Sequence, residues 1–88
     1  MVVVLPSHLH RYTGGVSELD LPLGECATLA DVLVELERRF RGIRFRVVDE
    51  QDRIRPHVKF FVGGEVAHAL DTLVGEREVL VVAALSGG

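Results

Sequence analysis

The sequence has few of the residues on which disulfide-based or metal-based structure depends. Its 88 residues include one cysteine, three prolines, no tryptophan and only five aromatic side chains. A single cysteine cannot close an intramolecular disulfide, which favours a reducing compartment, and we expect a cytoplasmic protein. Cys26 follows Glu25, a carboxylate that disfavours a thiolate, so we expect an inert thiol.

Long apolar runs are also missing. The longest extends over the seven residues from Val79 to Leu85, whereas a transmembrane helix needs about 20. The first six residues lack the basic flank and the length of a secretory signal. We therefore expect neither membrane insertion nor secretion.

Charge is unevenly distributed along the chain, whose net charge is −3. Residues 38–59 hold eight basic and three acidic residues, a local balance of +5, and the remainder holds two basic and ten acidic residues. Nucleic-acid-binding surfaces usually add a stacking platform or a groove-reading motif, and neither is evident here. The pattern favours a solvated or protein-docking surface, without direct nucleic-acid binding.

No residue pattern typical of an active site is present. The four histidines, His8, His10, His57 and His68, have no further ligands at metal-binding spacing. No serine lies in a nucleophile elbow, and no glycine-rich loop opens a helix. We expect a protein that is not itself an enzyme and that binds neither a metal nor a cofactor.

Two segments in the first part of the sequence are typical of strands. Residues 2–5 are continuously apolar, which predicts a strand covered on both faces. Gly14 and Gly15 suit a turn, and the alternation of Leu19, Leu21 and Leu23 then predicts a second strand.

The helix is the clearest element. Apolar residues recur at helical spacing from Leu29 to Phe40 and form one stripe. Thr28 and Asp31 have the spacing of a capping box, and Glu35 can pair with Arg39 one turn later. Gly42 can adopt the left-handed conformation that ends the helix.

The remaining pattern completes a small sheet. Residues 43–56 are irregular, with at most a short strand at 44–48, and residues 58–62 alternate. Gly63 and Gly64 predict a tight reversal, and residues 79–85 read as a central strand. The predicted fold class is α+β: a β-grasp (ubiquitin-like) mixed sheet with one main helix packed across one face.

The last residues form a narrow tail. We predict a β-grasp domain over residues 1–82 and a flexible tail over residues 83–88, ending in Leu85, Ser86, Gly87 and Gly88. Six extended residues reach at most about 20 Å, and glycine has no Cβ, so such a tail can thread a narrow channel in another protein.

The strand and hairpin from Val58 to Glu65 and the ending from Val79 to Gly88 resemble the MoaD/ThiS-type ubiquitin-like sulfur carriers over nearly the whole chain. The resemblance implies that Gly88 is adenylated and then converted to a thiocarboxylate that donates sulfur. ATP would be used by the activating enzyme and not held by this chain. The stretch from Leu9 to Gly15 resembles carriers that supply a cysteine synthase.

Three kinds of partner are implied by this resemblance. They are an E1-like adenylating enzyme, a sulfur donor (a sulfurtransferase or a cysteine desulfurase) and a sulfur-accepting biosynthetic enzyme. The acceptor pathway stays open among molybdopterin, thiazole, cysteine and tRNA thiolation. Two alternatives also stay open: a ubiquitin-like modifier conjugated through Gly88, and a plain β-grasp interaction module.

A docking patch is expected on the sheet face that the helix leaves open. Phe61 shares a side of its strand with Lys59, where it has no core role. The resemblance to ubiquitin-like proteins places Leu80 and Val82 on the same outer face. We predict that Phe61, Leu80 and Val82 form an exposed apolar patch that binds partner enzymes.

Overall fold

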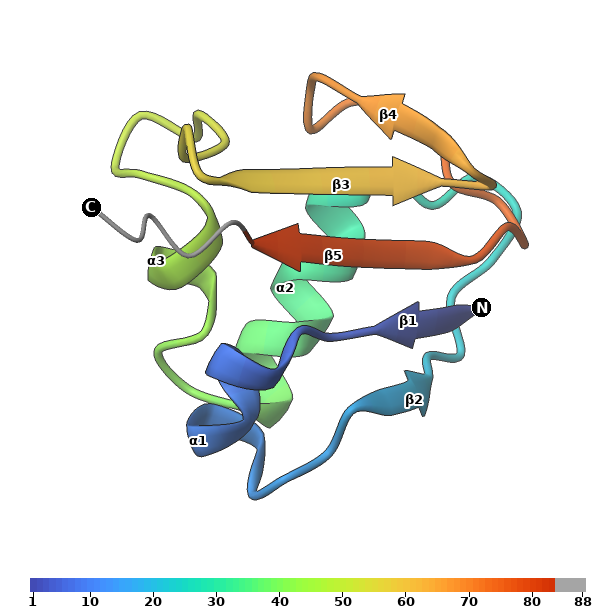
Figure 1. The fold of residues 1–88 in the computed structure, drawn as a ribbon. Coiled ribbons are helices and arrows are strands. Elements are labelled where there is room, and N and C mark those ends of the chain that lie inside the picture. The colour runs from blue at the N-terminus through green and yellow to red at the C-terminus, as the bar shows by residue number, and fades with distance from the viewer. Residues whose placement is uncertain (84–88) are drawn as a thin grey trace.

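The chain forms a five-stranded mixed sheet with its helices behind it, as the computed structural model in Figure 1 shows. The structure describes residues 1–83 of 88. The strands are β1 (Val2–Val4), β2 (Glu18–Asp20), β3 (Val58–Val62), β4 (Glu65–Ala67) and β5 (Val79–Ala83). The helices are the 3-10 helix η1 (Ser7–Leu9), α1 (His10–Thr13), α2 (Leu29–Arg39) and α3 (Arg44–Val47).

The first and last strands lie side by side in the middle of the sheet. The strand order is β2-β1-β5-β3-β4, and β1 runs parallel to β5, with Val3 opposite Val79. The remaining pairs are antiparallel. The central position of the last strand and the β-grasp fold class are thereby confirmed. Strand β5 extends to Ala83, the first residue of the expected tail.

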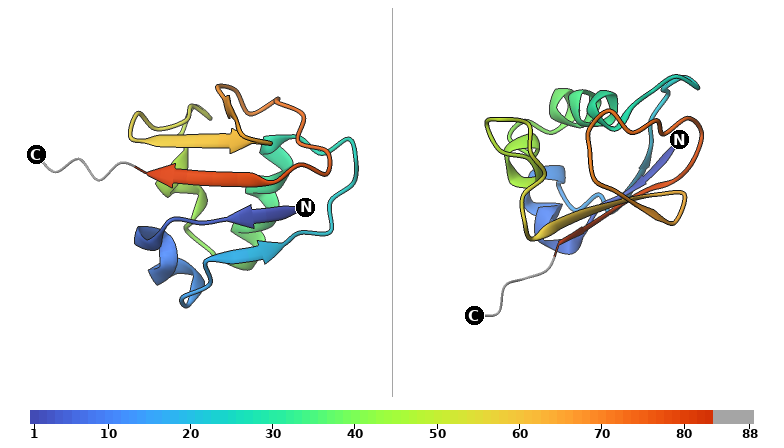
Figure 2. Two further views of the ribbon diagram at one scale, coloured as in Figure 1. Left: turned by 45° about the vertical axis from the view of Figure 1, so that its right-hand side comes forward. Right: turned by 90° about the horizontal axis from the view of Figure 1, so that it is seen from above.

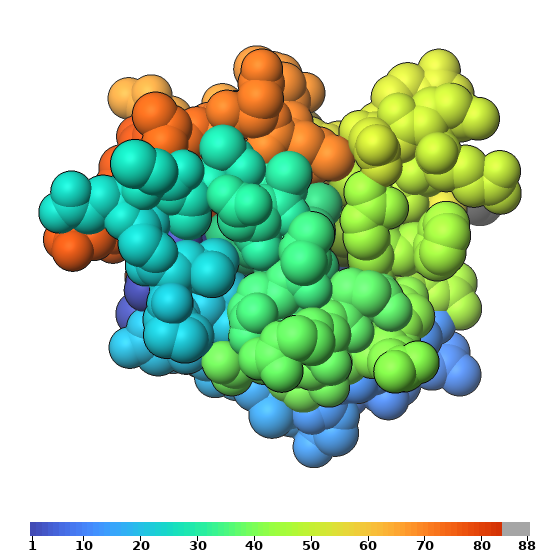
Figure 3. Space-filling view, turned by 180° about the vertical axis from the view of Figure 1, so that it is seen from behind, coloured from blue at the N-terminus to red at the C-terminus, as the bar shows by residue number. Residues whose placement is uncertain are grey.

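Helix α2 forms where the local sequence signals place it. Thr28 accepts a hydrogen bond from the backbone N–H of Asp31, and the Asp31 carboxylate accepts one from the backbone N–H of Thr28. This reciprocal cap satisfies two backbone donors at the start of the helix. Val32, Leu33 and Leu36 are buried against the sheet, and Figure 3 shows α2 and the loops beside it covering this face.

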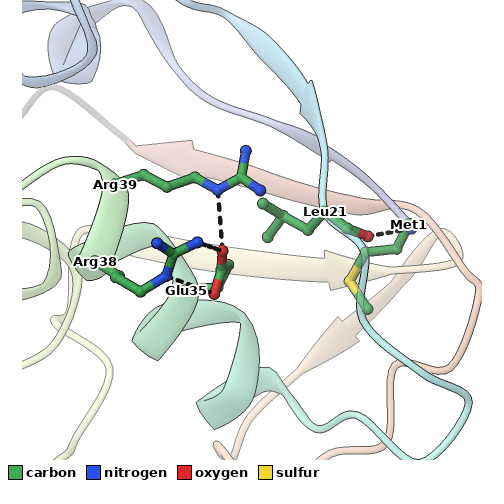
Figure 4. Close-up of polar contacts among 5 residues, drawn as sticks. All are labelled: Met1, Leu21, Glu35, Arg38 and Arg39. Atoms are coloured by element: carbon green, nitrogen blue, oxygen red, sulfur yellow. Dashed lines mark hydrogen bonds and ion pairs between the residues drawn. The ribbon is translucent and has the colours of Figure 1, made fainter.

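Polar contacts link side chains in the last turns of α2 and join the residues that flank β1 and β2 (Figure 4). Glu35 accepts hydrogen bonds from Nε of Arg38, at 3.2 Å, and from Nε of Arg39, at 3.0 Å. The bond from Arg38, followed by that from Arg39, lowers the pKa of Glu35 to about 2. The Met1 amino group donates to the backbone oxygen of Leu21 at 2.9 Å. The predicted pairing of Glu35 with Arg39 is thus confirmed.

Two local predictions were wrong. Residues 44–47 form the short helix α3 and no strand, because the Glu37 carboxylate accepts the backbone N–H groups of Gly42 (2.9 Å) and Arg44 (3.0 Å) and so directs the chain into a helical turn. The first strand is not covered on both faces, since Val2 and Val4 are partly exposed. Residues 7–13, for which no element was predicted, form η1 and α1.

Candidate functional site

The base of the predicted tail is fixed by the last strand. Ala83, the final described residue, lies opposite Val58 at the start of β3. The central strand β5 therefore finishes at one end of the sheet, as both views of Figure 2 show. The predicted tail residues Leu85, Ser86, Gly87 and Gly88 lie outside the described residues.

The three predicted patch residues lie together on one sheet face. Phe61 on β3 is directly opposite Leu80 on β5, and Val82 is opposite Lys59 on the same pair of strands. The alternate residues Phe60, Val79 and Val81 point into the core and are almost fully buried. Phe61 and Leu80 are partly exposed, and Val82 is 38% exposed. The open face in Figure 1 carries no helix among the described residues.

Two further valines extend the patch that sequence reasoning found. Phe61 is opposite Val66 on β4, and Leu80 is opposite Val4 on β1. Val66, Phe61, Leu80 and Val4 thus form a continuous apolar row across four strands, which we call the outer apolar row; Val82 lies two residues along β5 from it. Val66 is 40% exposed.

The position of Val66 could have been predicted from the turn sequence that precedes it. Gly63 and Gly64 have φ of +58° and +86°, so they form a two-residue turn with both central residues in the left-handed region. A two-residue turn sets Val62 opposite Glu65 and hence Phe61 opposite Val66. A Cβ on Gly63 would also lie 2.8 Å from Cδ of Arg77. Val4 had no comparable signal, because its place depends on the long-range pairing of β1 with β5.

Charged residues border the outer apolar row. On β2, Glu18 is opposite Val4, and Asp20 is opposite Val2. On β3, Lys59 lies two residues from Phe61 and opposite Val82, close to where β5 ends. An apolar centre with a polar rim is the usual composition of a protein-binding surface.

The other candidate side chains do not assemble a reaction centre in the described part of the chain. Within residues 1–83, no three His, Cys, Asp or Glu side chains gather as metal ligands. His10 Nε2 lies 3.4 Å from the backbone oxygen of Leu5, and Cys26 is exposed. No helix among these residues is long and apolar enough to cross a bilayer.

Several solved structures share this architecture over their full length. A chain of the Amycolatopsis orientalis BexX/CysO complex superposes with a TM-score of 0.84 at 24% identity, covering 99% of this chain and 98% of that one. SAMP1 from Haloferax volcanii matches with a TM-score of 0.82 at 24% identity, covering 100% and 98%. The CysO antigen of Mycobacterium tuberculosis matches with a TM-score of 0.83 at 26% identity, covering 96% and 98%.

The chain has the ubiquitin-like β-grasp fold. These neighbours confirm the fold class, and they confirm at the level of fold the resemblance stated from the sequence. No family model and no curated protein sequence matches the chain. The likeness of this ubiquitin-like protein to its neighbours therefore rests on three-dimensional structure, with low sequence identity.

Proposed function

We propose that this protein is a sulfur carrier whose terminal residue, Gly88, is activated and loaded with sulfur. The proposal is supported mainly by one observation: the full-length structural match to CysO and SAMP1, in a chain whose central strand is followed in the sequence by Ala-Leu-Ser-Gly-Gly. The chain would act in the cytoplasm as a co-substrate of other enzymes, with no catalytic centre of its own.

The chemistry requires two steps at one carboxylate. The Gly88 carboxylate attacks the α-phosphorus of ATP, pyrophosphate leaves, and an acyl-adenylate forms. A nucleophile whose sulfur is at the oxidation level of hydrosulfide then attacks the acyl carbon. A C–S bond forms, the C–O bond to AMP breaks, and a thiocarboxylate results. If the donor is an enzyme persulfide, a second thiol must reduce the acyl disulfide to release the thiocarboxylate.

The residues before Gly88 would let the terminal carboxylate enter the active site of a partner enzyme. Gly87 has no Cβ, and Ser86 is small, so the tail fits a channel too narrow for most side chains. Leu85 would anchor the tail at the channel entrance. Five residues beyond Ala83 reach at most about 17 Å, which separates the reacting carbonyl from the folded domain.

The outer apolar row, together with Val82, would dock the partner enzymes. Phe61, Leu80 and Val82 lie on strand β5 or beside it, so an enzyme bound there also receives the start of the tail. One surface would serve the adenylating enzyme and the sulfur acceptor in turn. Tight aromatic anchors of this kind dominate the binding energy of many interfaces.

The test of activation uses ATP–pyrophosphate exchange with the adenylating enzyme of the same organism. Gly88→Val places a branched side chain beside the reacting carbonyl and should abolish exchange. Gly24→Val is the matched control, because Gly24 lies in an exposed loop and a Cβ there meets no atom within 4 Å. Normal exchange by the Gly88 variant would refute the proposal.

Conjugation to proteins is the second candidate function. It is favoured by the match to a protein named small archaeal modifier protein 1, from Haloferax volcanii. In a lysate supplied with ATP, a modifier forms isopeptide adducts between Gly88 and lysines. Sulfide-dependent thiocarboxylate without such adducts supports the carrier. A version extended by several residues beyond Gly88 separates both from a plain interaction module, since only the module would keep its function.

A further inference from the structure

A cationic pocket lies at the end of the sheet where β5 finishes. It has a volume of about 280 Å³ and is lined by His8, Phe45, Arg46, Arg55 and His57. His57 precedes Val58, the residue that pairs with Ala83 at the end of β5. His8 follows β1, which is parallel to β5 and ends at the same side of the sheet.

The cations of the pocket are held in place by contacts from other segments. Nε of Arg55 donates to the backbone oxygen of Phe45 at 2.7 Å, which joins the segment before β3 to α3. The Arg46 guanidinium lies over the Tyr12 ring, 5.1 Å from its centroid. Within residues 1–83 no acceptor engages the terminal N–H groups of either side chain, so these groups are available to a ligand.

No carboxylate offsets this charge. Among the residues described, no carboxylate oxygen lies within 4 Å of the Arg46 or Arg55 guanidinium. Two of the three acids between these arginines in the sequence are engaged elsewhere, Asp49 with Arg53 and Asp52 with Arg44, and Glu50 forms no ion pair with either guanidinium. Burial, then the charges of His57 and Arg46, lower the pKa of His8. The pocket therefore concentrates positive charge, with no counter-charge from residues 1–83.

We propose that this pocket is an oxyanion-binding site, whose ligand is a single oxyanion group: a carboxylate of an acidic peptide or a free sulfate- or phosphate-type anion. Two guanidinium groups and two imidazoles converge on it, and oxyanions are the groups that such donors bind best. Its small volume admits one anionic group with its waters. Phe45, which is 55% exposed, supplies an apolar contact at the rim of the pocket.

The site should respond to pH through His8. The charged or titratable groups that face the pocket are His8, Arg46, Arg55 and His57, with Tyr12 behind Arg46. In the free protein the pKa of His8 is held below its usual value, by burial first and then by the charges of His57 and Arg46. A bound anion favours the imidazolium form of His8, so binding takes up protons and tightens as the pH falls. Each unit by which a bound anion raises this pKa tightens binding by up to about tenfold.

The test is an NMR titration of the full chain at low ionic strength with two probes, sodium sulfate and a hexaglutamate peptide. Sulfate stays a dianion from pH 5.5 to 8, so any pH dependence belongs to the protein. We expect saturable shifts of the His8 and His57 ring signals and a dissociation constant about tenfold lower at pH 5.5 than at pH 8. Binding of sulfate alone identifies a free anion as ligand, and preference for the peptide identifies an acidic protein segment.

Two charge-neutralising variants locate the site. Arg46→Gln should weaken binding about tenfold, as expected for one charge-assisted hydrogen bond. Arg41→Gln removes the same charge from a different surface, beside Val34 and Arg38, and should leave binding unchanged. The amide spectrum of each variant checks its fold. The proposal is overturned if neither probe saturates, if both variants weaken binding equally, or if affinity is the same at both pH values.

Discussion

Phe61 and Phe60 are neighbours on β3 that face opposite ways, and the pair tests the docking surface. Phe60 is fully buried, and Phe61 is partly exposed in the outer apolar row. Phe61→Thr removes the ring and keeps a β-branched residue suited to a strand. Phe60→Leu alters the core without touching the outer face. The two variants therefore separate loss of binding from loss of stability.

The stability cost of Phe61→Thr follows from its two cross-strand neighbours. Phe61 is paired with Leu80 on one side and with Val66 on the other. Each such pair contributes about 0.2–1 kcal/mol, so we expect a loss of about 1 kcal/mol. In a domain of this size that lowers Tm by about 4–8 °C. Phe60→Leu should cost a similar amount, about 1–1.5 kcal/mol, as a hydrophobic swap in a packed core.

The binding effects should differ sharply. Loss of an aromatic anchor costs about 2 kcal/mol or more, which is roughly a 30-fold weaker complex with the adenylating enzyme. Phe60→Leu should bind as the unmodified chain does. Titration calorimetry measures the affinities, and thermal melts measure the stabilities. Unchanged affinity for Phe61→Thr, or an equal loss for Phe60→Leu, would refute the assignment of the outer apolar row as a docking surface.

Three further predictions concern the helix and the cysteine. The pKa of Glu35 is lowered from 4.5 to about 2, so the stability that its ionised carboxylate contributes is complete above pH 4.5 and is lost as the pH falls toward 2. Glu35→Gln should therefore flatten the curve of Tm against pH between these values. The control Glu50→Gln, at an exposed position, should leave the curve unchanged. Thr28→Ala removes the N-cap of α2 and should cost about 1 kcal/mol by thermal or urea unfolding; an unchanged midpoint contradicts the capping argument. Cys26→Ser should still acquire sulfur at the terminus, and a well-folded variant without sulfur by intact mass would instead indicate a persulfide relay through Cys26.

Local signals determined much of the fold. The Thr28 and Asp31 cap, the apolar stripe of α2 and the Gly63–Gly64 turn each depend on residues within a few positions of one another. The core face of β3 followed from simple alternation. The sequence was therefore sufficient for these elements, although it did not predict the short helices η1 and α1.

Elements set by distant contacts were missed. Residues 44–48 alternate polar and apolar side chains, as a strand does, yet hydrogen bonds to Glu37 accompany a helical turn there. The role of Val4 in the outer apolar row depends on its pairing with β5. The cationic pocket joins residues from positions 8, 45, 46, 55 and 57, which no local pattern connects.

Intact-mass analysis of the loaded chain tests the central claim most directly. The chain is incubated with ATP, the adenylating enzyme and a sulfur donor, and the mass of the protein and of its C-terminal fragment is then measured. A thiocarboxylate replaces one oxygen by sulfur, and the account predicts this gain on the fragment that contains Gly88, only when ATP is present. If the chain binds the adenylating enzyme and supports its turnover of ATP but never gains sulfur at Gly88, the carrier function is contradicted.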